Sequence, residues 1–415
     1  MNANNDSSLR LAELHVERFH SIFSSDLTLQ PDITVLVGPN ASGKTNLIDA
    51  IKFVNDALYD GVDRAVGSRG SRAVLHRHAG RRSRLFTIEL AFASDSLTAK
   101  YRLRVRISSE GESSISYERI SGIDSFRQLE VNMRLSGGKF IREGLRASGL
   151  STALANLSYD SDSLMLSVMG DSQVVARAVA DSLYQGKRAE AAADMVWRLS
   201  NFVGEMRFYH LFPNVMREPK PPTAGETLEE DGENLASVVR KLVRERGEPY
   251  RQLVAALAAI VPDICDLRVN EAGGYNFVQL RHRSLSSESA ASGWVDLKSE
   301  SDGTVRMLGL LVALYQDQAP TLLVIEEPEL TVHVGALAVL ADAFNEVSSR
   351  TQIVLTTHSS DLLEHFDADS IRAVSSVDGR TTAGVLSETQ LTGLRRDLVT
   401  PGEIHRMEGL SAQEE

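Results

Sequence analysis

The sequence predicts an α/β protein with a mixed, mainly parallel sheet, an antiparallel β subdomain and a helical insert. A buried apolar run over 33–37 leads through a glycine-rich turn into a helix over about 44–58. The last third of the chain alternates short apolar runs with helical periods, which is typical of a parallel sheet covered by helices. Segments of alternating polarity and a long stretch of helical period predict the other two parts.

The chain begins with a predicted hairpin. It is indicated by alternating apolar positions over 11–19 and a second apolar run over 27–29. The strands of the antiparallel subdomain are expected over 85–92, 101–107 and 115–120. The helical segments are expected over 172–184, 189–203, 234–244 and 250–260. Short strands return over 267–269 and 277–280.

A proline-rich, acidic loop over 217–231 interrupts the helical part. Pro219, Pro221 and Pro222 disfavour a helix there because proline lacks the backbone donor that a helix interior needs. We therefore expect three parts. They are the N-terminal half of a head over 1–148, a helical insert or lid over 149–262, and the C-terminal half of the head over 263–415.

The composition is that of a globular domain, with 42% hydrophobic and 24% charged residues. No apolar run approaches the roughly 20 residues that span a bilayer, and the first residues lack the pattern of a secretion signal. The single cysteine, Cys265, is interpreted as a core residue and suits a reducing compartment. We expect a cytoplasmic protein without a membrane partner. A net charge of −12 argues against a surface that binds nucleic acid everywhere.

A phosphate-binding loop is predicted at 38–45. The segment GPNASGKT fits the pattern G-x-x-x-x-G-K-[ST] between a predicted strand and a predicted helix. Backbone N–H groups of such a loop wrap phosphates, Lys44 would reach the β- and γ-phosphates, and the Thr45 hydroxyl would ligate Mg²⁺. The predicted nucleotide-binding residues here are Gly38, Asn40, Ala41, Ser42, Gly43, Lys44, Thr45 and Asn46.

Two further apolar runs end in chemically active side chains. Residues 322–327 end in Glu326, expected to hold the Mg²⁺ shell, and Glu327, expected to act as general base on water. Side chains alternate along a strand, so the two carboxylates should differ in role if the strand extends that far. Residues 352–359 contain His358, a candidate donor to the γ-phosphate. The plainer interpretations are a solvated turn and a structural histidine.

The fourth motif is SDGT at 301–304, which opens a predicted helix. Ser301 or Asp302 is a plausible N-cap. Alternatively, Ser301 and Gly303 form a second phosphate-binding end. Taken alone, the motif does not separate these two interpretations.

In this order the four motifs resemble those of ABC-type ATPases. The pattern is similar to the RecF-like and SMC-like branch of AAA family ATPases, with SDGT as the signature, EEPE at 326–329 and TTHS at 356–359. The resemblance covers roughly the first 60 and last 130 residues. It departs from the branch at Val334, where relatives have proline, and at Glu326, where aspartate is usual.

The resemblance implies an ABC-type P-loop ATPase head that uses ATP and Mg²⁺. It also implies a homodimer, with larger assemblies open, in which Ser301 and Gly303 of one subunit contact the nucleotide held by Lys44 of the other. Catalysis would rest on Glu327 and His358. ATP-gated dimerisation would then control DNA or a separate effector protein, in DNA repair or in defence against phages and plasmids. The alternative is a scaffold that binds ATP without turnover and recruits a nuclease or toxin.

The best candidate for DNA contact is an arginine-rich stretch over 64–84 that contains seven arginines and no acidic residue. The candidate contacts are Arg69, Arg72, Arg77, Arg81 and Arg82. The alternative is a solvated loop whose arginines pair with acidic neighbours. Asp367 and Asp369 have a D-x-D spacing, but the roughly 55 residues after Ser359 are too few for an appended nuclease domain of ~100 residues.

Overall fold

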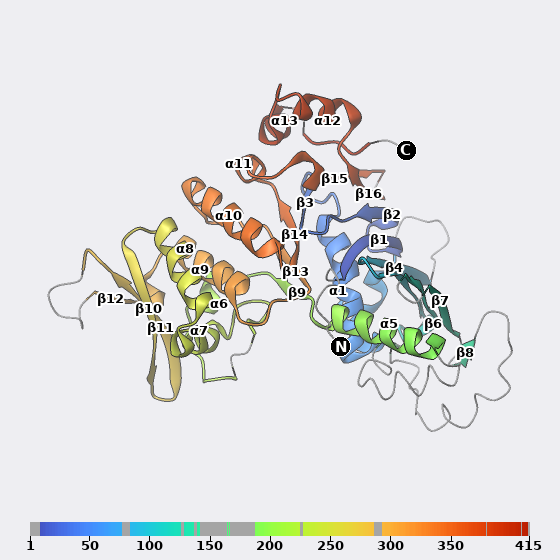
Figure 1. Ribbon diagram of the computed structural model, residues 1–415, viewed down its shortest axis with the longest axis horizontal. Coiled ribbons are helices and arrows are strands. Elements are labelled where there is room, and N and C mark those ends of the chain that lie inside the picture. The colour runs from blue at the N-terminus through green and yellow to red at the C-terminus, as the bar shows by residue number, and fades with distance from the viewer. Residues whose placement is uncertain are drawn as a thin grey trace.

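The computed structural model of the 415-residue chain contains three sheets (Figure 1). A six-stranded sheet lies in the middle, with a seven-stranded antiparallel sheet on one side and a three-stranded sheet on the other. The α/β fold class predicted from the sequence is confirmed. The residues that the structure describes are 9–76, 84–125, 128–136, 139–141, 164, 166, 187–224, 227–285, 293–378, 380–407 and 409–413.

The antiparallel sheet has the strand order β2-β1-β4-β5-β6-β7-β8. Its strands are β1 (Arg10–Phe19), β2 (Ile22–Thr28), β4 (Leu85–Ala93), β5 (Leu97–Ile107), β6 (Ser113–Asp124), β7 (Leu129–Ser136) and β8 (Lys139–Ile141). Alternate residues of β5 are buried, as expected for a sheet with one covered face. That face shares a core with α1 (Lys44–Asp60), α2 (Val62–Ser68) and α5 (Lys187–Gly204).

The central sheet has the order β16-β15-β3-β14-β13-β9 and is parallel except for the β15–β16 pair. Its strands are β3 (Ile33–Val37), β9 (Arg207–Tyr209), β13 (Leu322–Glu326), β14 (Gln352–Thr357), β15 (Ile371–Val377) and β16 (Arg380–Val385). Every residue of β3 and β14 is buried, because helices cover both faces. The carboxyl ends of the parallel strands therefore meet at one edge.

The central sheet is shared by two hydrophobic cores. Leu36 and Val324 face the core that contains α1, whereas Val35 and Leu323 face the core that contains α9 (Asp302–Tyr315) and α10 (Leu337–Ser348). All residues of α9 from Thr304 onward are buried, which explains why the sequence of this helix is apolar on every side.

The third sheet lies at the far side of α9 from the central sheet (Figure 1). It consists of β10 (Ile264–Ala272), β11 (Tyr275–His282) and β12 (Trp294–Asp296). The helices α6 (Pro213–Met216), α7 (Leu235–Glu245) and α8 (Glu248–Ile260) pack between it and α9. Short 3₁₀ turns occupy Ser71–Val74, Leu297–Ser299, Val334–Ala336 and Ala368–Ser370.

The last helices form a cap above the central sheet (Figure 1): α11 (Ser360–Leu363), α12 (Glu388–Arg395) and α13 (Pro401–Met407). Helix α13 packs closely on α11, since a side chain at Gly402 would come within 2.3 Å of the Ser360 carbonyl oxygen. His405 Nδ1 lies 2.9 Å from the Ser360 hydroxyl, and Arg406 pairs with Glu364. The cap is thereby fixed to the helix that follows the candidate histidine.

The described helices and strands of 149–262 are divided between the two cores of the molecule. Helix α5 joins the core of α1, β9 pairs with β13, and α7 and α8 join the core of α9. The helical period of a sequence predicts a helix but does not indicate which sheet that helix covers. The segment 172–184 lies outside the described residues. Among those that are described, no helix is long and apolar enough to cross a membrane.

Candidate functional site

The predicted phosphate loop lies between β3 and α1, at the edge where the parallel strands end. Both glycines of the G-x-x-x-x-G pattern, Gly38 and Gly43, are sterically required. A Cβ atom on Gly38 would lie 1.9 Å from the Val374 carbonyl oxygen, and one on Gly43 would lie 2.1 Å from Thr381 Oγ1. Gly43 is also left-handed, with φ 105°, and makes no side-chain cap to α1. The amide donors of the first turn of α1 are therefore open to an anion.

Lys44 is buried at the centre of this loop, with 6% of its surface exposed. Its ammonium group donates to the carbonyl oxygens of Gly38 at 2.9 Å and Pro39 at 3.2 Å. Burial lowers the pKa of Lys44, although the carboxylates of Glu327 and Glu326 act in the opposite direction. The cation thus sits between the loop and the two carboxylates that the sequence assigned to the same chemistry.

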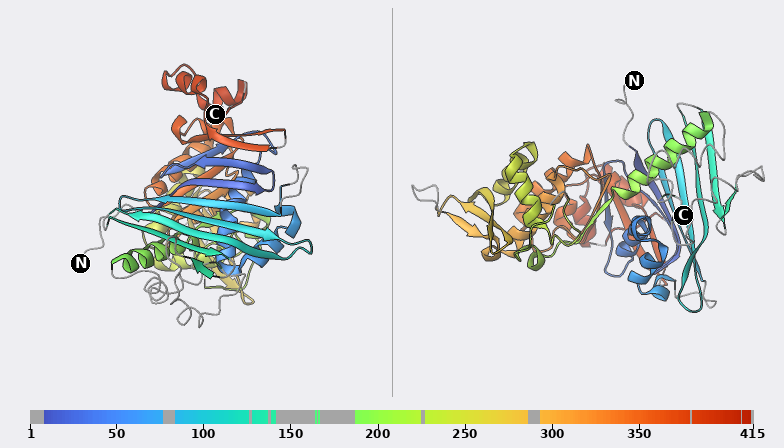
Figure 2. Two further views of the ribbon diagram at one scale, coloured as in Figure 1. Left: turned by 90° about the vertical axis from the view of Figure 1, so that its right-hand side faces the viewer. Right: turned by 90° about the horizontal axis from the view of Figure 1, so that it is seen from below.

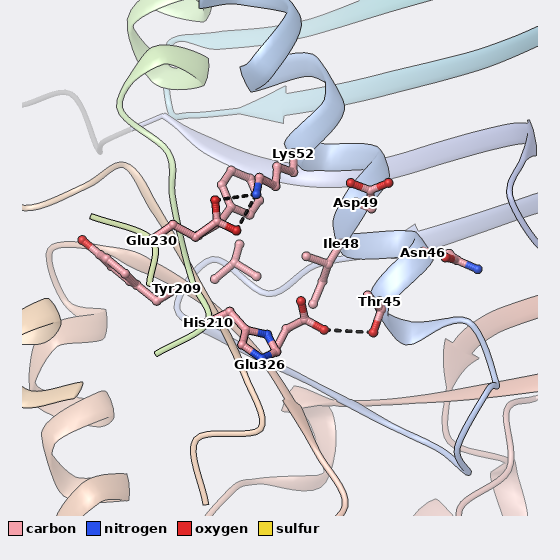
Figure 3. Close-up of a pocket in the computed structure, with 11 residues that line it drawn as sticks. Thr45, Asn46, Ile48, Asp49, Lys52, Tyr209, His210, Glu230 and Glu326 are labelled. Carbon is pink, nitrogen blue, oxygen red and sulfur yellow. Dashed lines mark hydrogen bonds and ion pairs between the residues drawn. The ribbon is translucent and has the colours of Figure 1, made fainter. Parts of the chain in front are cut away.

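The two predicted Mg²⁺ ligands contact each other. Thr45 Oγ1 at the start of α1 donates to Glu326 Oε2 at the end of β13, over 2.9 Å (Figure 3). Mg²⁺ is usually held by one or two protein oxygens together with waters and substrate phosphates. A hydroxyl and a carboxylate oxygen beside a phosphate loop fit that ion.

Glu327 lies just outside the strand that carries Glu326, which the sequence did not predict. The strand ends at Glu326, and Glu327 has a left-handed backbone with φ 47°. The Glu327 N–H donates to the carbonyl oxygen of Thr356 at 3.0 Å, and Arg306 Nη2 donates to the carbonyl oxygen of Glu327 at 3.0 Å. A turn rather than strand alternation therefore separates the two carboxylates. These contacts hold a conformation that is costly for a residue other than glycine.

His358 lies next to Glu327, with 3.7 Å between His358 Nε2 and Glu327 Oε1. Burial, followed by the charge of Lys44, lowers the pKa of His358 despite the nearby carboxylates. The imidazole is therefore biased towards the neutral form, in which one ring nitrogen donates. Lys44, Glu327 and His358 come from three different strand ends, as the sequence predicted.

Glu329 was not assigned a role from the sequence. Its Oε1 accepts from Thr357 Oγ1 at 2.7 Å and from the backbone N–H of His358 at 2.9 Å. Its Oε2 is buried without a hydrogen-bond partner among the described residues. Glu329 thus ties the loop after β13 to the end of β14 and fixes the backbone that carries His358.

Arg306 was also missed. It lies on α9 with only 5% of its surface exposed, and its Nη1 donates to the Leu211 carbonyl oxygen at 2.6 Å. Together with the bond to Glu327, this connects the helix that begins with the SDGT motif to the candidate base. The signal was available in the sequence, because a single charge inside an otherwise apolar helix must find a buried partner.

The SDGT motif opens α9, which packs on the opposite face of the central sheet from α1 and lies in the left half of Figure 1. Ser301 is an N-cap of α9, since its Oγ accepts from the Thr304 N–H at 3.1 Å. A Cβ atom on Gly303 would lie 2.6 Å from the Thr331 carbonyl oxygen, so the motif packs against the loop that follows Glu327. The capping interpretation therefore holds within one chain. Contact of Ser301 and Gly303 with a second subunit's nucleotide stays a prediction.

A cavity of about 170 Å³ adjoins the Thr45–Glu326 pair (Figure 3). His210, which follows β9, lines it, because β9 is the neighbour of β13 and ends at the same edge. The ion pair between Lys52 and Glu230 closes the opposite side in the same view. His210 is exposed and was not singled out from the sequence.

The arginine-rich stretch is only partly described. Arg77, Arg81 and Arg82 lie outside the described residues, and Arg72 is exposed. The position of Arg69 contradicts the hypothesis that this residue contacts DNA. Its side chain is 8% exposed, and Nη2 contacts Asp49 and Asp56, both at 2.7 Å. This guanidinium serves an internal ion pair on α1 and α2 and is not available to a ligand.

Comparisons with known proteins agree with this geometry. A family model described as "AAA domain, putative AbiEii toxin, Type IV TA system" matches residues 33–159 and 226–364, more than half of the chain. The DNA replication and repair protein RecF of Haemophilus ducreyi is 38% identical over 69 residues, 17% of this chain and 18% of the relative. RecF of Shewanella piezotolerans is 29% identical over 134 residues, 32% of this chain and 29% of the relative. The matched stretches thus span less than a third of either relative.

Two solved structures share the fold across nearly the whole chain. One is an SMC head bound to the C-terminal winged-helix domain of ScpA, with a TM-score of 0.55, 13% identity and coverage of 92% of this chain and 99% of that chain. The other is an SMC head with an extended coiled coil, bound to the C-terminal domain of ScpA and derived from Pyrococcus furiosus. It has a TM-score of 0.51, 14% identity and coverage of 94% and 99%. At such identity the likeness concerns the fold.

Proposed function

Since the chain belongs to the AAA-domain family matched above and is an ABC-type ATPase of the RecF/SMC-like branch, we propose that two copies close on each other around ATP and Mg²⁺ and part after hydrolysis. The observation that carries this proposal is the convergence of the loop around Lys44 with the ends of β13 and β14. Lys44, Glu327 and His358 approach one point from three strands, although they are far apart in the sequence.

Each group has a distinct task in this proposal. Lys44 and the amides of the loop grip the β- and γ-phosphates. Thr45 and Glu326 hold Mg²⁺, which when bound neutralises charge on the phosphates. Glu327 accepts the proton of the attacking water, and neutral His358 donates a hydrogen bond to the γ-phosphate. Glu329 and Arg306 hold the backbones of these two residues in place.

The SDGT motif of the second subunit completes the nucleotide site. Ser301 and Gly303 open α9, which packs in the core on the other face of the central sheet from α1. A helix N-terminus with a serine cap suits a phosphate, so a partner copy's nucleotide is its natural ligand. Closure would then depend on ATP in both sites.

The dimer would act on DNA or on a separate protein. RecF relatives are DNA replication and repair proteins, and the SMC heads of similar fold are bound to ScpA, a separate protein. The family description names a toxin of a toxin–antitoxin system. These names support a switch that regulates a bound partner, in DNA repair or in defence.

The test is Glu327→Gln. We expect phosphate release to fall by about 10²–10⁴, the usual contribution of a general base, while ATP binding persists and the nucleotide-bound dimer accumulates in light scattering. Glu388→Gln, an exposed change on α12, is the matched control. Wild-type turnover by Glu327→Gln, without a trapped dimer, would sink the proposal. Phosphate release with and without DNA separates a regulated ATPase from a scaffold that does not turn over.

A further inference from the structure

The face of the antiparallel sheet opposite α1, α2 and α5 carries a cluster of basic side chains. Along β5, buried Tyr101, Leu103 and Val105 alternate with basic residues that point to the opposite face. We call the six basic residues of β5, β6 and β7 on that face the sheet patch. They are Lys100, Arg102, Arg104, Arg106, Arg119 and Arg134.

Three of these arginines lie directly opposite one another. In the strand register Arg102 pairs with Arg119, and Arg119 pairs with Arg134. Opposite side chains in an antiparallel sheet have Cβ atoms only about 4.5–5.5 Å apart, and like charges placed there destabilise the sheet. A chain with a net charge of −12 thus concentrates positive charge where it costs stability. An anionic ligand at this face would offset that cost.

Glu17 and Glu89 are acidic side chains beside the patch, and Glu17 interacts electrostatically with Arg104. Glu89 contacts both Lys100 and Arg102, so one carboxylate is shared by two cations. Neutral groups also serve as partners: Arg119 donates to the Asn132 amide oxygen at 3.0 Å, and Arg134 lies 4.8 Å from the centre of the Tyr117 ring. Among the described residues, the six basic side chains of the patch thus outnumber the carboxylates of Glu17 and Glu89.

The patch is accessible among the described residues. In the left-hand view of Figure 2, β4 to β7 form the front layer and the helices of this core lie behind them. The side chains of Lys100 and Arg102 are 56% and 40% exposed. With strands about 4.8 Å apart and about 3.3 Å per residue, the patch measures roughly 10 by 20 Å. That is a suitable size for several phosphates of a nucleic-acid backbone.

We propose that the sheet patch binds the phosphate backbone of double-stranded DNA. The arginines supply bidentate donors to phosphate oxygens. Tyr117, the aromatic ring within the patch, is covered by Arg134, so the surface lacks an open ring for stacking unpaired bases. Binding is thus independent of base sequence and strongly salt-dependent. The surface lies on the opposite side of the sheet from α1, so DNA and nucleotide do not compete.

The experiment compares two triple variants with the same change in net charge. Arg102→Gln/Arg119→Gln/Arg134→Gln removes three charges from the patch. Arg240→Gln/Arg244→Gln/Arg251→Gln removes three from α7 and α8, where these side chains are 51%, 77% and 64% exposed. Fluorescence anisotropy with a labelled 30-bp duplex is measured at several salt concentrations. Basal phosphate release and thermal unfolding without DNA confirm that each variant is folded.

We expect the patch variant to bind at least 10-fold more weakly than wild type, with the slope of log K against log salt reduced in magnitude by about 2–3. The control variant should keep both values. The proposal is overturned if wild type does not bind, or if both triple variants lose affinity equally. If the patch variant does not fold, Lys100→Gln/Arg106→Gln replaces it, with about 2 units of slope expected and an unchanged slope as the contrary result. Anisotropy does not require hydrolysis, so this test stands apart from that of Glu327→Gln.

Discussion

Arg306 offers the sharpest test of how this site is held together. The change Arg306→Met keeps an unbranched side chain in the interior of α9 but removes the guanidinium. Two carbonyl oxygens, that of Leu211 in a buried and that of Glu327 in a partly buried position, then lose donors at 2.6 and 3.0 Å. Each charge-assisted bond is worth about 1.5–3 kcal/mol. Part of that is regained because the buried cation no longer has to be desolvated.

The effect on catalysis follows from the backbone of Glu327. Its left-handed φ of 47° is an unfavourable conformation of order 1–3 kcal/mol that persists only while neighbours hold it. Without Arg306 the carbonyl oxygen of Glu327 loses its hydrogen bond, and the Glu327 carboxylate is no longer held in one orientation. If about 1.4–2.8 kcal/mol of transition-state stabilisation is lost, kcat falls by about 10–100-fold. KM for ATP should change little, because Lys44 and its loop make no contact with Arg306.

The assay is single-turnover phosphate release together with urea unfolding of each variant. Arg306→Lys retains the charge but not the two-pronged geometry and should lie between wild type and Arg306→Met. A folded Arg306→Met protein with wild-type kcat would show that Glu327 keeps its position without this arginine. Parallel loss of kcat and of the folded fraction would show that the residue acts only on stability.

Three other changes probe the surroundings of the site. Gly303→Ala places a methyl 2.6 Å from the Thr331 carbonyl oxygen, so steady-state turnover should fall while ATP binding by single subunits, measured by calorimetry, remains. Burial lowers the pKa of His282, but the hydrogen bond to Glu300 and a second carboxylate outweigh it and raise the pKa above 6.5. The contribution of His282 to the free energy of unfolding should therefore be complete below about pH 6.5 and be lost as pH rises through the folded-state pKa. His282→Gln should remove this pH dependence in urea titrations. Gly402→Ala brings a methyl within 2.3 Å of a backbone oxygen of α11; we expect faster amide exchange in α13, and unchanged exchange would refute the close packing inferred there.

The motifs that follow single strands were readable from the sequence. Lys44 was identified from the phosphate-loop pattern that follows an apolar run, and Glu326 and His358 because they lie where apolar runs end. The edge of a parallel sheet brings such ends together. Ser301 was seen as a cap for a local reason, namely its position before a helical period. Local pattern suffices where the partner lies within a few residues.

What could not be foreseen depends on neighbours that are distant in the sequence. Glu329 matters because it reaches Thr357 on the next strand, and the sheet patch exists because β5, β6 and β7 align their arginines in register. Neither pairing leaves a trace in the sequence of one strand. Arg69 was misjudged for the same reason, since its partners Asp49 and Asp56 lie about two turns apart on another helix, α1.

The shared central sheet has a mechanical consequence. Because Val35 and Leu36 face opposite cores, each strand in the middle is a common wall of two compartments. Unfolding of either core uncovers one face of the central sheet and exposes apolar side chains that the other core cannot cover. We therefore expect the unfolding of the two lobes to be coupled through the central sheet.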